Sequence, residues 1–464
     1  MPYQIFSKCI HGAGHIDKGM PCEDYGMVYE DGSCKIFTVA DGHGDSNCPR
    51  SNIGSRLICE LAISELKEFS DSILLQCWET DLFDSLKAEP IIRQLITSLF
   101  GKWSCAVNEQ LNSNPLTAEE LEQAKEYADS YRQGKYTEHI YGTTLIAGII
   151  TEKYILLLQQ GDGRCVVFDE NMKPTQPVPW DDRCFANVTT SVCDSDAVSS
   201  CRYYVINTQE EHISACIAGS DGVEDSYSSM EKMHAFYRSL LMIACNESTE
   251  KMEEYLDRFL PELSSNGSRD DITISGVIDV DCVRPFLARM AVENEIVDIE
   301  DEIARTDDKI KSMSRKMEFL QKQYDSFKEQ SDATVKKYND ICIELERIGK
   351  DIESFENNTS DNSINSIVQE CKDESIISAA SSFVEILKEK TLSSYSLNWL
   401  RVRKQNLEKE KAEIENEVNE IERRRAEIEN EYIPFKERYD SFVKSKEEAQ
   451  QKKNELLLKL NSFA

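Results

Sequence analysis

The sequence predicts an α+β globular domain followed by a long α-helical coiled coil. Over residues 1–282, short β-branched runs punctuated by glycine alternate with longer amphipathic stretches, which is typical of an α+β fold. Three apolar runs in this part each end in an Asp-Gly pair. Beyond Pro285, proline and glycine nearly vanish, charged residues dominate and apolar residues take a three-four spacing. We therefore place one domain at residues 1–282 and a coiled-coil arm at residues 283–464.

Length and charge restrict the function classes. A chain of 464 residues exceeds one ordinary core, so two or three domains are expected. The net charge of -32 argues against a nucleic-acid partner, because such proteins need a basic face to displace counterions. No run of eighteen apolar residues and no apolar leader occurs, so we expect a soluble, cytoplasmic protein without a membrane partner. The 16 cysteines are scattered singly, which favours reduced, mostly buried thiols over a disulfide framework.

The three Asp-Gly pairs each follow a predicted strand. Residues 35–40 run into Asp41-Gly42-His43, residues 154–159 into Gly161-Asp162-Gly163, and residues 213–218 into Ser220-Asp221-Gly222. Glycine after aspartate allows a sharp turn and lets a carbonyl group or a hydrated metal come close. Any one of these pairs, taken alone, is more simply read as a turn. For His43 the functional reading and that of a surface or turn histidine are equally open.

Two acidic pairs flank further predicted strands and complete a set of five acidic sites. Glu23-Asp24 precedes residues 25–29, and Asp270-Asp271 precedes residues 272–278. The ends of adjacent strands can meet at one edge of a sheet, where carboxylates repel one another unless cations neutralise them. Oxygen ligands favour Mg²⁺ or Mn²⁺ over zinc. The full set therefore predicts a site for hard divalent ions.

Helices are expected between these strands. One should open at Arg50-Ser51, directly after the Asp41 loop, because Ile53, Leu57 and later leucines lie on or near one face. Residues 89–108 form a second amphipathic stretch. Residues 114–135 are polar and helix-prone, which indicates a surface insertion before the next strand.

The arm is predicted to contain two long helices, at about 287–356 and 397–463. Apolar residues keep three-four spacing from Ile296 to Phe355, a helix of roughly 90 Å at 1.5 Å per residue. A polar tip at about 357–396 follows, with a short helix over residues 376–387. A heptad series then runs from Leu400 to Phe463. The matched lengths favour an antiparallel hairpin, although a dimer of such helices would show the same heptads.

Six short motifs in the first domain resemble those of one enzyme family. In chain order they are Glu23-Asp24, Ala40-Asp41-Gly42-His43-Gly44, Tyr141-Gly142-Thr143-Thr144, Gly161-Asp162-Gly163-Arg164, Ser220-Asp221-Gly222 and Arg269-Asp270-Asp271-Ile272-Thr273. Their order and spacing resemble the metal-dependent serine/threonine protein phosphatases of type 2C, in a bacterial-like branch, over about residues 8–280. The resemblance implies a four-layer α-β-β-α sandwich of two antiparallel sheets, with a two-metal centre at one end.

The resemblance also implies roles for individual residues. By motif, Asp41 bridges two ions, Mn²⁺ or Mg²⁺, and His43 is the general acid for the leaving alcohol. The other residues implied at the metals are Glu23 and the Gly42 carbonyl for one ion, Asp221 and Asp270 for the other, Asp162 for a third and weaker ion, and Asp24 orienting a metal-bound water. A hydroxide between two divalent ions is a strong nucleophile at neutral pH, so no covalent protein intermediate is required. Cys22 and Cys48 are read as packing residues.

One position departs from the family pattern. Relatives carry a phosphate-clamping arginine four residues before the glutamate of the Glu-Asp pair, and here that residue is Gly19. Lys18 or His15 is the candidate replacement, although lysine offers a point charge where arginine offers a bidentate fork.

Two functions remain from these observations. The first is a protein serine/threonine phosphatase that hydrolyses phosphomonoesters of a phosphorylated protein, with an arm for partner binding, sensing or homodimerisation. The second is a catalytically weak phosphatase-fold scaffold or sensor that acts through the coiled coil, which the missing arginine favours.

Overall fold

The computed structural model describes residues 2–185, 188–360 and 376–463, with side chains described outside residues 358–393. The chain forms two compact units, which we describe separately. The first runs to Glu300 and takes in the chain from Lys453, and the second is Asp301–Lys452. The first unit thus extends past the predicted domain end at residue 282, because Met290 and Val292 of the following helix are buried.

In the described part of the chain, ten strands form two antiparallel five-stranded sheets, which confirms the predicted fold class. The first sheet has the order β1-β10-β9-β6-β7 and the second has the order β2-β3-β4-β5-β8. The strands are β1 (Gln4–Ile10), β2 (Tyr25–Glu30), β3 (Lys35–Ala40), β4 (Leu145–Ile150), β5 (Tyr154–Gln160), β6 (Arg164–Asp169), β7 (Pro174–Thr175), β8 (Arg202–Asn207), β9 (Ile213–Gly219) and β10 (Ile272–Ile278).

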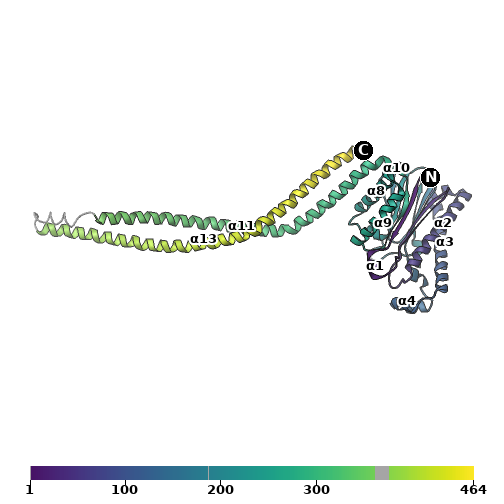
Figure 1. The fold of residues 1–464 in the computed structure, drawn as a ribbon, viewed down its shortest axis with the longest axis horizontal. Helices are drawn as coiled ribbons and strands as arrows, with labels where there is room; N and C mark the ends of the chain where they lie inside the picture. The colour runs from purple at the N-terminus through teal and green to yellow at the C-terminus, as the bar shows by residue number, and fades with distance from the viewer. Residues whose placement is uncertain (1, 186–187, 361–375, 464) are drawn as a thin grey trace. The chain divides into compact units, whose positions relative to one another are not determined.

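Helices cover the outer face of each sheet, as Figure 1 shows. Helices α2 (Ser51–Gln76) and α3 (Ser85–Ser113) bury Ile58, Leu66 and their neighbours against the second sheet. Helices α8 (Met230–Asn246) and α9 (Thr249–Asn266) pack on the first sheet. Between the sheets, Phe37 and Val277 belong to a third apolar cluster. The inner strands are therefore covered on both faces, which explains their continuous apolar sequences.

The predicted helix positions agree with the structure in the first unit. Helix α2 begins at Ser51, and the polar insertion contains α4 (Ala118–Gln123) and α5 (Ala128–Arg132). Thr117 and Glu120 cap α4 reciprocally. The other short helices are α1 (Ala13–Lys18), η1 (Glu79–Phe83), η2 (Lys125–Tyr127), η3 (Thr137–Tyr141), α6 (Ala197–Ser200), α7 (Asp221–Glu224), α10 (Val280–Val283) and η4 (Arg284–Phe286).

The antiparallel order brings the acidic strand ends to one edge of the sandwich. Tyr25 at the start of β2 pairs with Ala40 at the end of β3, so Glu23-Asp24 and Asp41 flank the same rung of the ladder. In the first sheet, Ile274 near the start of β10 pairs with Gly219 at the end of β9. The acidic residues next to β9 and β10 therefore also lie at one edge.

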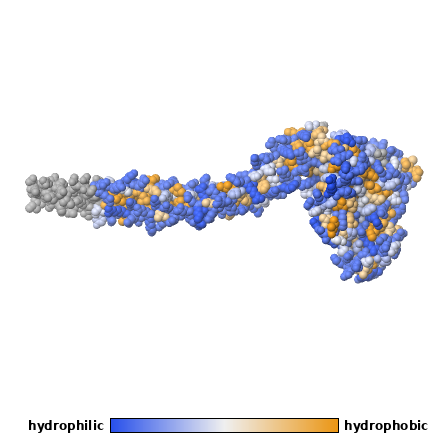
Figure 2. Space-filling model, viewed as in Figure 1, coloured by the Kyte–Doolittle hydropathy of each residue, from blue (hydrophilic) through white to orange (hydrophobic). Residues whose placement is uncertain are grey.

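Two long helices, α11 (Leu287–Ser360) and α13 (Ile376–Asn461), pair in antiparallel fashion in the second unit. The rings of Tyr324 and Tyr432 stack with centroids 4.9 Å apart. Asp307 pairs with Lys446 at 2.6 Å, so residues late in α13 meet residues early in α11. The surface of this hairpin is mainly hydrophilic (Figure 2). These contacts within one chain agree with the predicted hairpin.

The returning helix begins earlier than the sequence analysis expected. Helix α13 is continuous from Ile376, so the short helix expected over residues 376–387 is its first part. No proline or glycine occurs between Ile376 and Ile433, and nothing in this stretch therefore forces a break. The first half of the polar tip, residues 361–375, lies outside the described residues.

Two general expectations can be compared with the described part of the chain. None of its helices combines the length and the apolar character that a bilayer-spanning segment needs. Every cysteine described there is a free thiol.

Candidate metal centre

The loop after β3 is held by the residues before β4. The Asp41 amide donates to the Thr144 hydroxyl at 3.0 Å, and the Thr143 hydroxyl donates to the Asp41 carbonyl at 2.9 Å. The Thr144 amide also donates to that carbonyl at 2.8 Å. The Gly142-Thr143-Thr144 motif therefore positions the Asp41 side chain through the backbone on both sides of it.

Glu23 is joined to the same loop and to the start of α2. The Gly42 amide donates to the Glu23 carbonyl at 3.2 Å, and a side chain at Gly42 would place its Cβ 2.6 Å from that oxygen. Ser51 donates to Glu23 Oε2 at 2.7 Å and Ser55 donates to the Glu23 carbonyl at 2.6 Å. Glu23 is thus buried and fixed, and only glycine fits at position 42.

Three further carboxyl groups converge on this point. Burial raises the pKa of Asp41, and the nearby carboxylates of Asp221 and Asp24 raise it further. Burial raises the pKa of Asp221 to about 6. It also raises the pKa of Asp24, together with the Cys9 thiol and the Asp271 carboxylate. The pKa values of Asp41 and Asp221 each depend on the other carboxyl group, so the two side chains are close neighbours.

The donor set fits divalent cations. Asp24 Oδ2 and Asp221 Oδ1 are buried and have no hydrogen-bond partner among the described residues. Orphaned carboxylate oxygens at one spot are costly without a cation, and oxygen ligands suit Mg²⁺ or Mn²⁺. Asp24, Asp41 and Asp221 come from three strand ends, as the sequence pattern predicted.

The two residues of the second acidic pair, Asp270 and Asp271, differ in how exposed they are. Asp271 is buried, accepts hydrogen bonds from the Gly12 and Glu23 amides at 2.6 Å each, and contacts His15 Nδ1 at 2.8 Å. Burial alone would raise the pKa of Asp271, but these hydrogen bonds lower it overall. Asp270 is half exposed, with Oδ1 3.6 Å from His15 Nε2. Asp271 therefore joins the segments that carry Gly12, His15 and Glu23, while Asp270 presents its carboxylate at the solvent-exposed surface of the centre.

Asp162 lies in the loop between β5 and β6. Its carboxylate contributes to the raised pKa of both Asp221 and Asp225, so it borders the Asp221 side of the centre. Gly161 has φ +103, a conformation that favours glycine. The loop thus places Asp162 on the Asp221 side of the centre.

The two candidate phosphate-binding residues differ in position. The hydrogen bond to Asp271 raises the pKa of His15, and Gly44 next to the Asp41 loop approaches the His15 ring. Lys18 is exposed at the end of α1 and has no contact with the acidic residues in the described part of the chain. Gly19 caps α1 with φ +68, a conformation in which arginine would be strained. The structure brings His15 to the centre and leaves Lys18 outside it.

His43 is held on the other side of the Asp41 loop. Its Nε2 lies 2.8 Å from Ser191 Oγ, and its amide donates to the Gly142 carbonyl at 3.2 Å. Burial lowers the pKa of His43. Burial therefore favours the neutral imidazole.

Several supporting residues were not predicted from the sequence. Ser191 had no recognisable signal, because it lies in an irregular segment far along the chain from His43. Ser51 was expected only as the start of a helix, and it also binds Glu23. The contact between His15 and Asp271 joins residues 256 positions apart.

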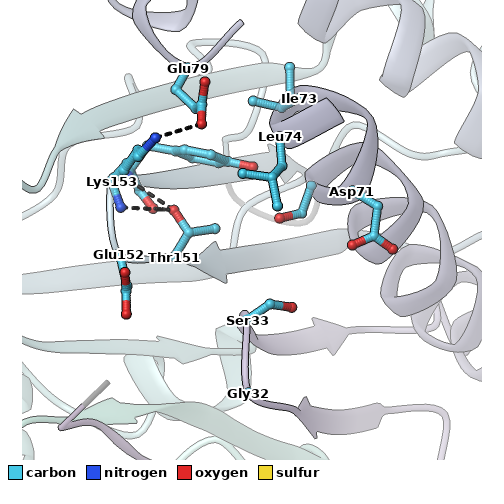
Figure 3. Close-up of a pocket in the computed structure, with 11 residues that line it drawn as sticks. Gly32, Ser33, Asp71, Ile73, Leu74, Glu79, Thr151, Glu152 and Lys153 are labelled. Carbon is cyan, nitrogen blue, oxygen red and sulfur yellow. Dashed lines mark hydrogen bonds and ion pairs between the residues drawn. The ribbon is translucent and has the colours of Figure 1, made fainter. Parts of the chain in front are cut away.

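A hollow on the surface of the first unit lies away from these residues. A cavity of about 210 Å³ is lined by the β2–β3 turn, the end of α2 and the β4–β5 turn. Figure 3 shows Lys153 paired with Glu79 across it, at 2.8 Å. The β2–β3 turn lies at the opposite end of its strands from Glu23 and Asp41, so this cavity is separate from the metal centre.

A comparison with protein-family models decides the family. Residues 11–261, more than half of the chain, match the model described as protein phosphatase 2C. The chain belongs to the protein phosphatase 2C family. This membership confirms the predicted family and the enzyme class, a metal-dependent serine/threonine phosphatase, and it agrees with Mn²⁺ or Mg²⁺ as the cofactor.

Solved structures similar to this protein phosphatase 2C chain are distant. A bacterial serine phosphatase is 16% identical, with 60% of this chain and 97% of that chain covered and a TM-score of 0.38. The catalytic domain of the phosphatase PstP, in complex with two manganese ions, is 15% identical over 60% and 97%, with a TM-score of 0.34. Stp1 from Staphylococcus aureus is 16% identical over 60% and 94%, with a TM-score of 0.37. No curated protein matches the chain.

Proposed function

We propose that this chain hydrolyses phosphoserine and phosphothreonine monoesters in proteins, using Mn²⁺ or Mg²⁺ held at the acidic edge of the sandwich. The observation that carries the proposal is the convergence of Asp24, Asp41 and Asp221, where one buried oxygen each of Asp24 and Asp221 has no hydrogen-bond partner among the described residues. Such a group is unfavourable without cations, and it supplies the hard ligands that these ions prefer.

The proposed ligands are those that the family resemblance implies, and the proximity of Asp41 to Asp24 and Asp221 supports them. Asp41 would contribute to both ions. Glu23 and the Gly42 carbonyl would hold one ion, and Asp221 and Asp270 would hold the other. Asp162 borders the Asp221 side, where a third ion would bind. Asp24 orients water at the centre. When bound, the ions supply an activated water for attack on phosphorus and screen the charge of the phosphate.

The protein's own residues complete the reaction. Asp271 holds the His15 imidazole through Nδ1, which favours the protonated ring and leaves Nε2 facing the opening towards Asp270. We assign His15 the contact with the substrate phosphate that arginine makes in relatives. Ser191 orients His43 for proton transfer to the leaving serine or threonine oxygen. Because burial lowers its pKa, His43 needs the negative phosphate nearby to hold that proton.

Hydrolysis of a phosphothreonine peptide by the full chain tests the proposal. Activity should require Mn²⁺ or Mg²⁺, and Asp41→Asn should lower kcat/KM by at least about 100-fold, because it removes the charge of the bridging ligand. Asp129→Asn, an exposed aspartate of the insertion, is the matched control and should retain activity. Equal background rates in wild type and Asp41→Asn would instead support the weak phosphatase-fold scaffold.

The replacement of the arginine is tested by a pair of variants. His15→Gln should raise KM for the phosphopeptide by about tenfold, because it removes the cation at the opening. Lys18→Ala should change KM less than twofold, because Lys18 is exposed outside the centre. A larger effect of Lys18→Ala than of His15→Gln would reverse this assignment.

We propose that the arm contacts another protein. Tyr395, Trp399 and Val402 are exposed by 73%, 66% and 48% and are spaced four and three residues apart on α13, so they form one apolar stripe. Exposed aromatic side chains of this kind are typical of interfaces. The solution mass of the full chain distinguishes the partners. A mass of two chains that falls to one in Trp399→Ala indicates homodimerisation, and a mass of one chain leaves a different protein as the partner.

A further inference from the structure

A second group of metal-ligating side chains lies at the end of the first sheet opposite the acidic edge. His212 directly precedes β9, Asp279 directly follows β10, and Cys282 lies in α10. Both strands are seven residues long and lead at their other ends to Asp221 and Asp270. At about 3.4 Å per residue, the two groups are on the order of 20 Å apart. This cluster is therefore independent of the phosphatase centre.

The geometry of the three side chains suits a common ion. One ligand atom from each, a ring nitrogen, a carboxylate oxygen and a thiol sulfur, lies within 4.8 Å of the other two. His212 Nε2 is 3.3 Å from Asp279 Oδ2. Two ligand atoms that coordinate the same zinc ion, each at about 2.0–2.3 Å, lie roughly 3–4 Å from one another. Only small movements are therefore needed to place an ion between them.

The polar atoms of this cluster are incompletely satisfied. His212 Nε2 is buried and has no hydrogen-bond partner among the described residues, although it faces Asp279. Asp279 is almost fully buried, and its Oδ1 accepts a hydrogen bond from the Cys282 amide at 3.2 Å. Ion pairing with His212 and capping of α10 explain Asp279, but the contact with His212 lacks hydrogen-bond geometry, so His212 Nε2 has no hydrogen bond among the described residues. A metal ion supplies the missing partner.

Neighbouring groups hold the ligands in place. The Asp279 amide donates to the Ser214 carbonyl at 2.8 Å, which fixes the end of β10 against the start of β9. The Tyr3 ring stacks on His212 with centroids 6.4 Å apart, and its hydroxyl donates to the Ile213 carbonyl at 2.6 Å. Tyr3 is thus a support for the imidazole and not a ligand. Part of the His212 side chain remains exposed, so solvent can reach the site.

We propose that His212, Asp279 and Cys282 bind a transition-metal ion of the Zn²⁺ and Co²⁺ class, with water as the fourth ligand. The mixed nitrogen, oxygen and sulfur set distinguishes this site from the phosphatase centre, because thiolate and imidazole favour such ions over Mg²⁺ and Mn²⁺. The thiol proton passes to solvent when the ion binds. The ion joins β9, β10 and α10, and α10 leads through η4 into α11.

Titration of the full chain with Co²⁺ in excess Mg²⁺ tests the proposal, because Mg²⁺ occupies the oxygen ligands of the phosphatase centre. A thiolate-to-cobalt charge-transfer band should develop with one equivalent of Co²⁺ and disappear when Zn²⁺ is added. Cys282→Ser should abolish the band. Cys77→Ser, which removes an exposed thiol elsewhere in the first unit, is the matched control and should retain it.

A second variant separates ligand loss from unfolding. His212→Gln changes a partly exposed side chain and should weaken Co²⁺ binding by more than the 10–100-fold typical of changes around a metal ligand, with phosphopeptide hydrolysis unchanged. Zn²⁺ should raise the melting temperature of the wild type, and this shift should be lost in His212→Gln. Absence of the band in the wild type, or its persistence in Cys282→Ser, overturns the proposal. Co²⁺ affinity of His212→Gln equal to that of wild type also overturns it.

Discussion

The metal-free protein should lose stability as the pH rises, because its phosphatase centre gathers carboxylic acids that resist ionisation. The folded protein raises the pKa of Asp221 from 3.8 to about 6, and it raises the pKa values of Asp24 and Asp41 as well. A raised carboxyl pKa means that the folded state binds the proton more tightly than the unfolded state. The contribution of Asp221 is therefore fully present below about pH 4 and is lost as the pH rises through about 6.

The size of this effect follows from the shift at Asp221. A difference of one pH unit in pKa corresponds to 1.36 kcal/mol, so the change from 3.8 to about 6 corresponds to at most roughly 3 kcal/mol. For a domain of this size, that is a fall in melting temperature on the order of 5–10 °C. Asp24 and Asp41 extend the loss to higher pH. Divalent cations should cancel it, because they bind the ionised carboxylates only in the folded state.

Thermal unfolding in a chelator between pH 4 and pH 8 tests this reasoning, because the loss at Asp221 occurs mainly between pH 4 and pH 6. The melting temperature of the wild type should fall over this interval, and Asp221→Asn should fall less, by up to the amount given above. Mn²⁺ at pH 8 should restore the melting temperature of the wild type, and it should raise the melting temperature of Asp221→Asn by less. Asp129→Asn controls for a simple change of net charge and should follow the wild type. The argument is refuted if, in the chelator, the melting temperature of the wild type falls with pH no more steeply than that of Asp221→Asn.

Two further predictions concern packing in the first unit. Gly54→Ala should destabilise it by about 3 kcal/mol or more, because the new Cβ would lie 1.9 Å from the Tyr141 carbonyl oxygen. Gly101→Ala, where the new Cβ meets open space, should stabilise it by up to about 1 kcal/mol. Equal free energies of unfolding of the two variants in chemical denaturation would contradict this. A protein truncated after Glu300 should melt at a higher temperature than one truncated after Cys282, because the first turns of α11 are buried against α8. Calorimetry measures the two melting temperatures. Equal melting temperatures would place the domain end at residue 282.

Local signals in the sequence were sufficient for the elements and for the acidic edge. The Asp-Gly pair at Asp41 marks the end of β3, since apolar strand residues followed by a turn are visible within a few positions. The heptads of the arm likewise predicted two long helices. The start of α13 was placed too late, because the polar residues of the predicted tip from Ile376 onward are tolerated inside a helix where no proline or glycine interrupts them.

Sequence patterns were therefore sufficient to predict the class of fold, an oxygen-rich metal centre and the helical arm, because each prediction depends on residues close together in the chain. Which distant side chains meet depends instead on the tertiary fold. His15 reaches Asp271, and His43 reaches Ser191, through the order of strands in the two sheets. The cluster of His212, Asp279 and Cys282 exists for the same reason. Strand order and register arise from packing of the whole core, and no short segment carries that information.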